Sequence, residues 1–278
     1  MGLPAIKSGV RLCLQKNKAP FAIKETARLY FDEYGDKNNP TILLLHGAGA
    51  LDTFSGQYGF FDQYHLIVPH LPGAGKAVHK AYEPKKVIKE LIALIESESL
   101  HKGKIGVIGH SLGGQIAVML VSRRPELFQF AVFLSAWVNP SPKTVQTYCA
   151  LAGLSVKMLH WKWLVRLQAK YWNYTTGQAD FMVEYMERMT PQVYRSFFAK
   201  TLDLSKLPGY LEVTVPMLAV CGAREVKDMK ISLKKLAQNP NCRTVMLQRA
   251  GHDFPMRNAR QLNPMLLQFI LAITKICQ

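Results

Sequence analysis

The chain has 278 residues, of which 49% are hydrophobic, and it carries a formal net charge of +16. This length suits one large α/β domain or a core with a modest insertion. No apolar run reaches 18 residues, so no transmembrane helix is expected, and the first fifteen residues lack the features of a secretory signal. The lysines are scattered and no nucleic-acid motif is present, so we favour a basic soluble surface over weak peripheral association with an anionic membrane.

Cysteine usage points to a reducing compartment. The five cysteines are widely spread and none belongs to a C-x-x-C pair. They are Cys13, Cys149, Cys221, Cys242 and Cys277. We therefore expect free thiols, a cytoplasmic location and no metal site.

Strand-like and helix-like segments alternate along the chain, which is typical of a mostly parallel sheet covered by helices on both faces. An antiparallel edge hairpin is expected within residues 21–34. The predicted strands are 41–45, 65–68, 105–108, 130–134, 217–221 and 244–247, and the predicted helices are 84–97, 111–122 and a last one with Asn263 as its N-cap, running toward Ile276.

One stretch interrupts the alternation. Residues 137–205 contain no convincing strand, and they hold all four tryptophans of the chain. These are Trp137, Trp161, Trp163 and Trp172. The sequence therefore predicts a core made of residues 1–136 and 206–278, with a helical insertion over residues 137–205 between two core strands.

Ser111 lies in a G-x-S-x-G pattern between a strand-like run and an apolar helix. This is the context of a nucleophile elbow, a sharp turn that exposes the serine hydroxyl at the carboxyl end of the sheet. The tight turn favours glycine at the flanking positions, Gly109 and Gly113. An ordinary glycine-rich turn with an N-cap serine is the alternative.

A serine nucleophile needs a base and an orienting carboxylate. His252 follows the last predicted strand, which is where this arrangement requires the base. Glu225 follows the preceding strand and is the favoured acid, with Asp228 as the alternative. The two N–H groups of an oxyanion hole are expected from Leu112 and from Ala48, in the small-residue loop 46–50.

These segments together resemble the α/β-hydrolase superfamily. The matching stretches are residues 43–47, 71–75, 109–114, 215–217 with Gly222, and 251–252. The chain departs from the family at His70 and Ala77, where Asp and Ser are common, and these positions support a loop. Serine at the elbow speaks against the branches that use an aspartate nucleophile. The resemblance implies a helical lid at residues 137–205, whose aromatic side chains either line a pocket or pack the lid onto the core.

The implied chemistry is acyl transfer through Ser111, without a cofactor, on a small to medium carboxylic ester with lipophilic character. Substrate-pocket candidates are His110, Trp137, Trp161 and Trp163. A thioesterase, a carbon–carbon bond hydrolase, an acyltransferase and a non-catalytic receptor of the same fold stay open, as does a homodimer.

Overall fold

A computed structural model describes residues 23–25 and 29–274, and an eight-stranded sheet forms its centre. The strands are β1 (Ile23–Glu25), β2 (Tyr30–Tyr34), β3 (Thr41–Leu45), β4 (His65–Pro69), β5 (Ile105–His110), β6 (Phe128–Leu134), β7 (Met217–Gly222) and β8 (Cys242–Leu247), in the spatial order β1-β2-β4-β3-β5-β6-β7-β8. β2 pairs antiparallel with β1 and β4, and the other pairings are parallel. The predicted α/β-hydrolase fold, with its mostly parallel sheet, is confirmed. Phe21, at the start of the predicted hairpin, lies outside the described residues.

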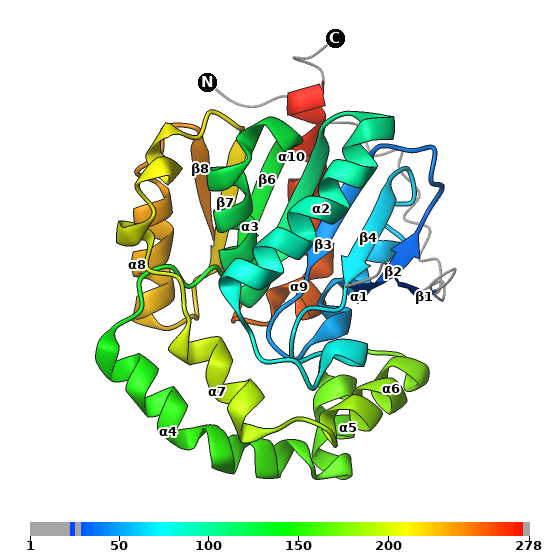
Figure 1. The fold of residues 1–278 in the computed structure, drawn as a ribbon, viewed down its shortest axis with the longest axis vertical. Coiled ribbons are helices and arrows are strands. Elements are labelled where there is room, and N and C mark those ends of the chain that lie inside the picture. The colour runs from blue at the N-terminus through cyan, green and yellow to red at the C-terminus, as the bar shows by residue number, and fades with distance from the viewer. Residues whose placement is uncertain (1–22, 26–28, 275–278) are drawn as a thin grey trace.

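Helices cover both faces of the sheet. The core helices are α1 (Ser55–Tyr58), α2 (Pro84–Lys102), α3 (Leu112–Arg123), α8 (Lys227–Leu236), α9 (Phe254–Arg257) and α10 (Ala259–Thr274), with 3₁₀ turns at Leu51–Phe54, Gly75–Ala77, Pro125–Leu127, Leu204–Lys206 and Pro208–Glu212. In Figure 1, α2 and α3 lie in front of the sheet and α10 lies behind it. Because both faces are covered, every residue of β3, β4 and β5 is buried, and these strands read as near-continuous apolar runs.

The start of the last helix differs from the prediction. α10 begins at Ala259, so Asn263 is not its N-cap and Pro264 lies inside the helix. Pro264 removes one backbone hydrogen bond, but the buried stripe of Leu262, Leu266 and Ile270 keeps the helix packed on the core. The Asn263 side chain instead bonds to the α1 segment, donating to Gly56 O at 2.9 Å. Ile276 lies outside the described residues.

Four helices lie between β6 and β7 in the chain. They are α4 (Pro142–Leu159), α5 (Lys162–Tyr171), α6 (Thr176–Met186) and α7 (Pro191–Ala199). Ser141, Thr175 and Thr190 start α4, α6 and α7 as N-caps, each accepting a backbone N–H three residues later. Figure 1 shows this helical insertion lying together at the lower end of the molecule, beyond the carboxyl ends of the parallel strands. Within the described residues, none of the helices combines the length and the apolar character needed to cross a bilayer.

Candidate active site

The turn between β5 and α3 is held by very close backbone packing. Ser111 has φ 54° and ψ −113°, in a region that side chains other than glycine rarely adopt. A Cβ on Gly109 would overlap the carbonyl of Gly113, and a Cβ on Gly113 would overlap that of Leu45. The predicted need for glycine at both positions therefore has a steric cause, and the turn presents Ser111 above the sheet edge.

Three side chains form a hydrogen-bonded row at this edge. His252 Nε2 lies 3.0 Å from Ser111 Oγ, and His252 Nδ1 lies 2.7 Å from Glu225 Oε2. Ser111 follows β5, Glu225 follows β7 and His252 follows β8, so the parallel topology brings their strand ends to one edge of the sheet. The Glu225 side chain is almost fully buried, whereas that of His252 is 44% exposed.

Glu225 accepts two further hydrogen bonds. Its Oε1 accepts from Ser135 Oγ at 2.7 Å and from the Gly222 N–H at 2.6 Å. Burial raises the pKa of Glu225, but the contacts with His252, Gly222 and Ser135 together lower it more, so the net pKa lies below its usual range and the group is ionised near neutral pH. The sequence-based prediction missed Ser135, although its place directly after β6 is a signal that it shares with Ser111 after β5.

The alternative acid contacts a different partner. Asp228 lies in the first turn of α8, and its Oδ2 accepts from Thr144 Oγ1 at 3.1 Å. It faces the same cavity as Ser111 without bonding to His252. The geometry therefore joins Glu225, rather than Asp228, to the histidine.

Both expected oxyanion donors border the cavity in front of Ser111. Leu112 is the first residue of α3, so its N–H has no acceptor within the helix. His46 accepts the Leu71 N–H at Nε2 (3.0 Å), so its Nδ1–H donates to Gly47 O (2.7 Å). In a trans peptide the N–H points away from the C=O, so this bond holds the Ala48 N–H on the opposite side. Burial lowers the pKa of His46 to about 4, which keeps the ring neutral and this tautomer in place.

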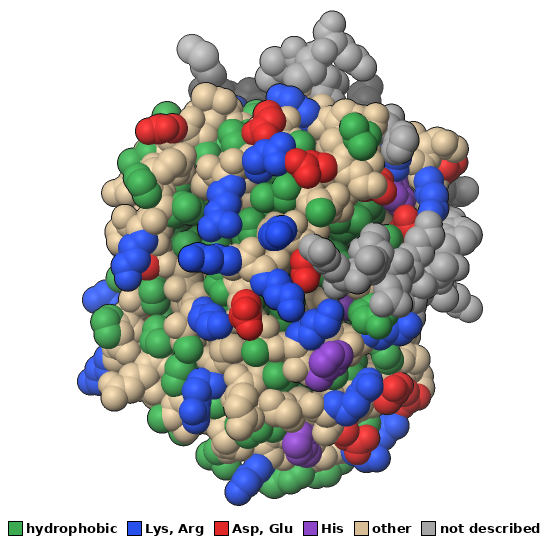
Figure 2. All heavy atoms as spheres, viewed as in Figure 1, with side chains coloured by type: hydrophobic (Ala, Val, Ile, Leu, Met, Phe, Trp, Pro, Cys, Tyr) green, Lys and Arg blue, Asp and Glu red, His purple; other side chains and the backbone are tan. Residues whose placement is uncertain are grey.

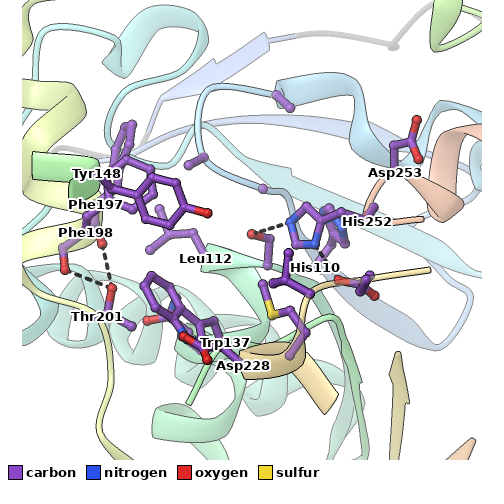
Figure 3. Close-up of a pocket in the computed structure, with 18 of the residues that line it drawn as sticks. His110, Leu112, Trp137, Tyr148, Phe197, Phe198, Thr201, Asp228, His252 and Asp253 are labelled. Carbon is purple, nitrogen blue, oxygen red and sulfur yellow. Dashed lines mark hydrogen bonds and ion pairs between the residues drawn. The ribbon is translucent and has the colours of Figure 1, made fainter. Parts of the chain in front are cut away.

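His110 braces the loop that carries His252. Its Nε2–H donates to the backbone oxygen of His252 at 2.8 Å, and the two rings lie 4.9 Å apart between centroids. Burial lowers the pKa of His110 to about 3, so the ring is neutral. Figure 3 shows the two histidines next to each other at one wall of the cavity. His110 thus borders the cavity, as predicted, and also supports His252 from behind.

The cavity has a volume of about 580 Å³. The sheet edge forms one wall, and aromatic side chains form the other. The aromatic residues are Trp137, Tyr148, Trp172, Tyr194, Phe197 and Phe198. Trp137 was predicted to lie here, and Tyr148, Phe197 and Phe198 face it together in Figure 3. Tyr194, Phe197 and Phe198 were missed, although their i, i+3, i+4 spacing in α7 indicates one helix face.

Trp161 and Trp163 do not line the cavity, which corrects the prediction for these two residues. They are 50% and 64% exposed and stack on each other on the outside of the insertion. For Trp163 the reason is the register of α5, in which Val165 and Ala169 face inward and Trp163 falls on the opposite side, while Trp161 precedes the helix as its N-cap. Aromatic content alone does not reveal which face of a helix a ring occupies.

Among the described residues, no group of three or more His, Cys, Asp or Glu side chains is arranged to hold a metal ion.

Comparison with known proteins gives a family match over most of the chain. The model of the alpha/beta hydrolase family matches residues 42–264. RutD of Stutzerimonas stutzeri (strain A1501), whose name describes a carbamate hydrolase, is 22% identical over 268 residues, covering 87% of this chain and 96% of that protein. RutD of Pseudomonas syringae pv. syringae (strain B728a) is 32% identical over 118 residues, but this match covers only 39% of this chain and 43% of that protein.

Solved structures share the fold at low sequence identity. A protein described as a lipase (lip1) from Acinetobacter baumannii AYE superposes with a TM-score of 0.72 at 19% identity, covering 91% of each chain. The enol-lactonase from Burkholderia xenovorans LB400 gives 0.71 at 18% identity, covering 87% of this chain and 96% of that one. At these identities the likeness establishes the fold alone, while the hydrolase names of the sequence relatives support an enzyme.

Proposed function

Because the chain belongs to the alpha/beta hydrolase family, we propose that it is a serine hydrolase that cleaves a carboxylic ester through an acyl intermediate on Ser111. The observation that carries this proposal is the hydrogen-bonded row of Ser111, His252 and Glu225, which opens onto a largely aromatic cavity. A carboxylate, an imidazole and a hydroxyl in this order can raise the nucleophilicity of the hydroxyl.

In the first step, Ser111 Oγ attacks the ester carbonyl carbon while its proton passes to His252 Nε2. Glu225 holds the Nδ1–H and stabilises the imidazolium that forms. The carbonyl oxygen becomes an oxyanion and accepts the N–H groups of Ala48 and Leu112. One such donor contributes roughly 10²–10³ to the rate.

In the second step, His252 gives its proton to the leaving alkoxide as the C–O bond breaks, and the alcohol departs. Water then attacks the acyl carbon, and His252 takes a proton from the water. Collapse of the second tetrahedral intermediate expels Ser111, which regains its proton from His252. The products are a carboxylic acid and an alcohol.

The walls of the cavity favour a small to medium acyl ester with lipophilic character. The aromatic side chains of the insertion supply most of the apolar surface. Trp137 contributes apolar ring surface to this wall, because its indole N–H is buried and has no hydrogen-bond partner among the described residues.

We also propose that residues 137–205 act as a lid over a core of residues 1–136 and 206–278. Two contacts support it at the oxyanion loop. Tyr185 Oη in α6 donates to Gly49 O at 3.0 Å, and the space where Gly49 would carry a Cβ is occupied by Met186, with Cε 3.0 Å away. A shift of α6 would therefore disturb the loop that carries Ala48.

The test is intact-mass labelling with a fluorophosphonate, in wild type and in Ser111→Ala, beside p-nitrophenyl esters of rising chain length. Stoichiometric labelling that is lost in the variant supports the proposal, and the chain-length optimum sizes the pocket. Folded wild-type protein that is not labelled would overturn it in favour of a non-catalytic receptor. Because relatives are named for a carbamate and an enol-lactone, the panel includes a carbamate and a lactone. A thioester and a β-diketone test the other hydrolases that the sequence leaves open. Added alcohol reveals an acyltransferase by its ester product.

A further inference from the structure

The outer face of the helical insertion concentrates exposed apolar side chains. Among the described residues, thirteen large hydrophobic side chains are exposed, and eight of them lie in or between α4 and α5. These eight, which we call the α4–α5 face, are Tyr148, Leu151, Leu154, Met158, Trp161, Trp163, Leu167 and Tyr171. A groove of about 640 Å³ runs between the two helices within this face. Figure 2 shows hydrophobic side chains at the lower end of the molecule, where Figure 1 places these helices.

The segment that carries this face contributes only basic side chains. Residues 141–172 contain five basic residues and no acidic one, namely Lys143, Lys157, Lys162, Arg166 and Lys170. Lys162 and Arg166 pair with Glu187 and Asp180, which come from α6 and its C-terminal end. Lys143, Lys157 and Lys170 make no ion pair with the carboxylates that the structure describes. Exposed Trp, Tyr and Leu flanked by unpaired lysines are the side chains that enter the headgroup region of an anionic bilayer.

The α4–α5 face is also joined to the cavity of the candidate active site. Tyr148 is 39% exposed on α4 and lines the cavity as well. Tyr194 lines both the cavity and the outer groove. Tyr148 and Tyr194 each pack against Phe198, with ring centroids 4.8 and 5.4 Å away. A layer of aromatic rings is thus shared by the groove and the cavity.

We propose that the α4–α5 face docks on an anionic lipid bilayer and that substrates with an apolar tail enter the cavity from there. A second copy of the chain fits less well, because a two-fold dimer through this face would set its lysines against the same lysines. The docking proposal depends only on the α4–α5 face, whereas the substrate-entry proposal also depends on the proposed ester hydrolysis.

The experiment is co-sedimentation of the full chain with phosphatidylglycerol-containing vesicles and with pure phosphatidylcholine vesicles, at low and high salt. We expect binding to the anionic vesicles that weakens at high salt, because screening shortens electrostatic reach from about 10 Å at 0.1 M to about 3 Å at 1 M. Trp163→Ser with Leu167→Ser should remove most of the binding. Lys157→Gln with Lys170→Gln should weaken it by about fivefold for each lysine.

Matched controls separate this face from general basic adhesion. Leu211→Ser removes a side chain that is 54% exposed, against 57% for Leu167, but lies outside the insertion helices. Lys85→Gln with Lys86→Gln removes the same charge from α2. Both controls should bind as wild type does.

Three results would overturn the docking proposal. They are no binding to anionic vesicles, equal weakening by the α2 control pair, and a dimer in solution that Trp163→Ser dissociates while vesicle binding is absent. Since binding needs no acyl transfer, Ser111→Ala should sediment as wild type does. Fluorophosphonate labelling without vesicle binding would leave the proposed hydrolase standing, and vesicle binding without labelling would leave docking standing.

Discussion

The sheet edge and the helical insertion face each other across one cavity, but they are held by different means. At the sheet edge, backbone groups approach so closely that Gly109 and Gly113 have no room for a side chain. In the insertion, Gly153 and Gly177 have open space where a Cβ would stand. Close backbone packing holds side chains that must lie within hydrogen-bond distance of one another. The side chains of the insertion can be substituted without moving those groups. The proposal therefore places the reacting groups and the substrate preference in separable parts of the chain.

The largest expected effect comes from the sheet edge. Ser111→Ala and His252→Ala should each lower kcat on a p-nitrophenyl ester by roughly 10⁴–10⁶, because each removes a group that the acyl-transfer step requires. The double variant should lose little more than either single one, because the two groups act as a unit. Circular dichroism controls for folding. Additive losses would contradict the shared role.

The next prediction distinguishes Glu225 from Asp228 as the carboxylate that assists His252. Glu225→Gln should lower kcat by about 10⁴, because an amide beside His252 Nδ1 stabilises neither the required tautomer nor the imidazolium. Asp228→Asn should act mainly on KM, by less than about tenfold, because Asp228 borders the cavity and bonds to Thr144. The kcat and KM of both variants are measured on one ester. A larger kcat loss in Asp228→Asn would move the acid role to Asp228.

A matched pair of glycine substitutions tests the difference in packing directly. Gly113→Ala should lower the free energy of unfolding by about 3 kcal/mol or more, because its Cβ would meet the carbonyls of Leu45 and His46, which belong to the backbone and cannot swing aside. Gly153→Ala, inside α4, should raise it by about 0.5–1 kcal/mol through helix propensity. Urea unfolding measures both. Similar effects at the two sites would contradict the contrast.

The same difference explains how much the sequence predicts. At the sheet edge, local geometry dictates residue type, so the elbow glycines, the position of Ser111 and the strand ends can be derived from short patterns. The sequence favours a hydrogen bond from His252 to Glu225 over one to Asp228 but does not decide between them. The two carboxylates lie only three positions apart, and the path of the chain from β7 into α8 determines which of them meets His252.

The insertion is less predictable because its contacts are tertiary. Its helical character follows from composition, but nothing local indicates that Trp137 turns inward while Trp163 turns outward. That choice depends on which face of each helix meets the core, and the aromatic rings are large enough to stabilise either side. The predicted start of α10 was wrong for a related reason. Asn263 is a residue type that often caps helices, but here its side chain bonds to α1 instead.

The contact between Asp52 and α6 should give a pH-dependent effect. Burial raises the pKa of Asp52 to about 6, although Gln178 Nε2 donates to its Oδ1 at 2.9 Å, and nearby Asp32 raises this pKa further while His70 lowers it. In the folded chain a proton is therefore bound more tightly than in the unfolded chain, whose pKa is near 3.8. The stabilising effect of Asp52→Asn should be largest above pH 6, roughly 1–3 kcal/mol, and should vanish as pH falls toward 3.8.

Urea unfolding at about pH 4 and about pH 8 measures this effect. Asp62→Asn, at an exposed position, controls for the general loss of a negative charge. An increase in the free energy of unfolding that is equal at both pH values, or that also occurs in Asp62→Asn, would contradict burial of Asp52 as the cause.

The smallest effect should come from two buried tyrosines of the insertion that differ in one hydrogen bond. Tyr185 Oη donates to Gly49 O, whereas Tyr174 Oη is buried without a partner among the described residues. Tyr185→Phe should lower kcat by about two- to tenfold, because one neutral hydrogen bond contributes roughly 0.5–1.5 kcal/mol and this one steadies the loop that carries Ala48. Tyr174→Phe removes an unpaired hydroxyl and should leave kcat unchanged while stability stays equal or rises. The kcat of each variant is measured beside its urea midpoint. If Tyr185→Phe lowered stability alone, α6 would support the fold without steadying the oxyanion loop, and the sheet edge would hold that loop by itself.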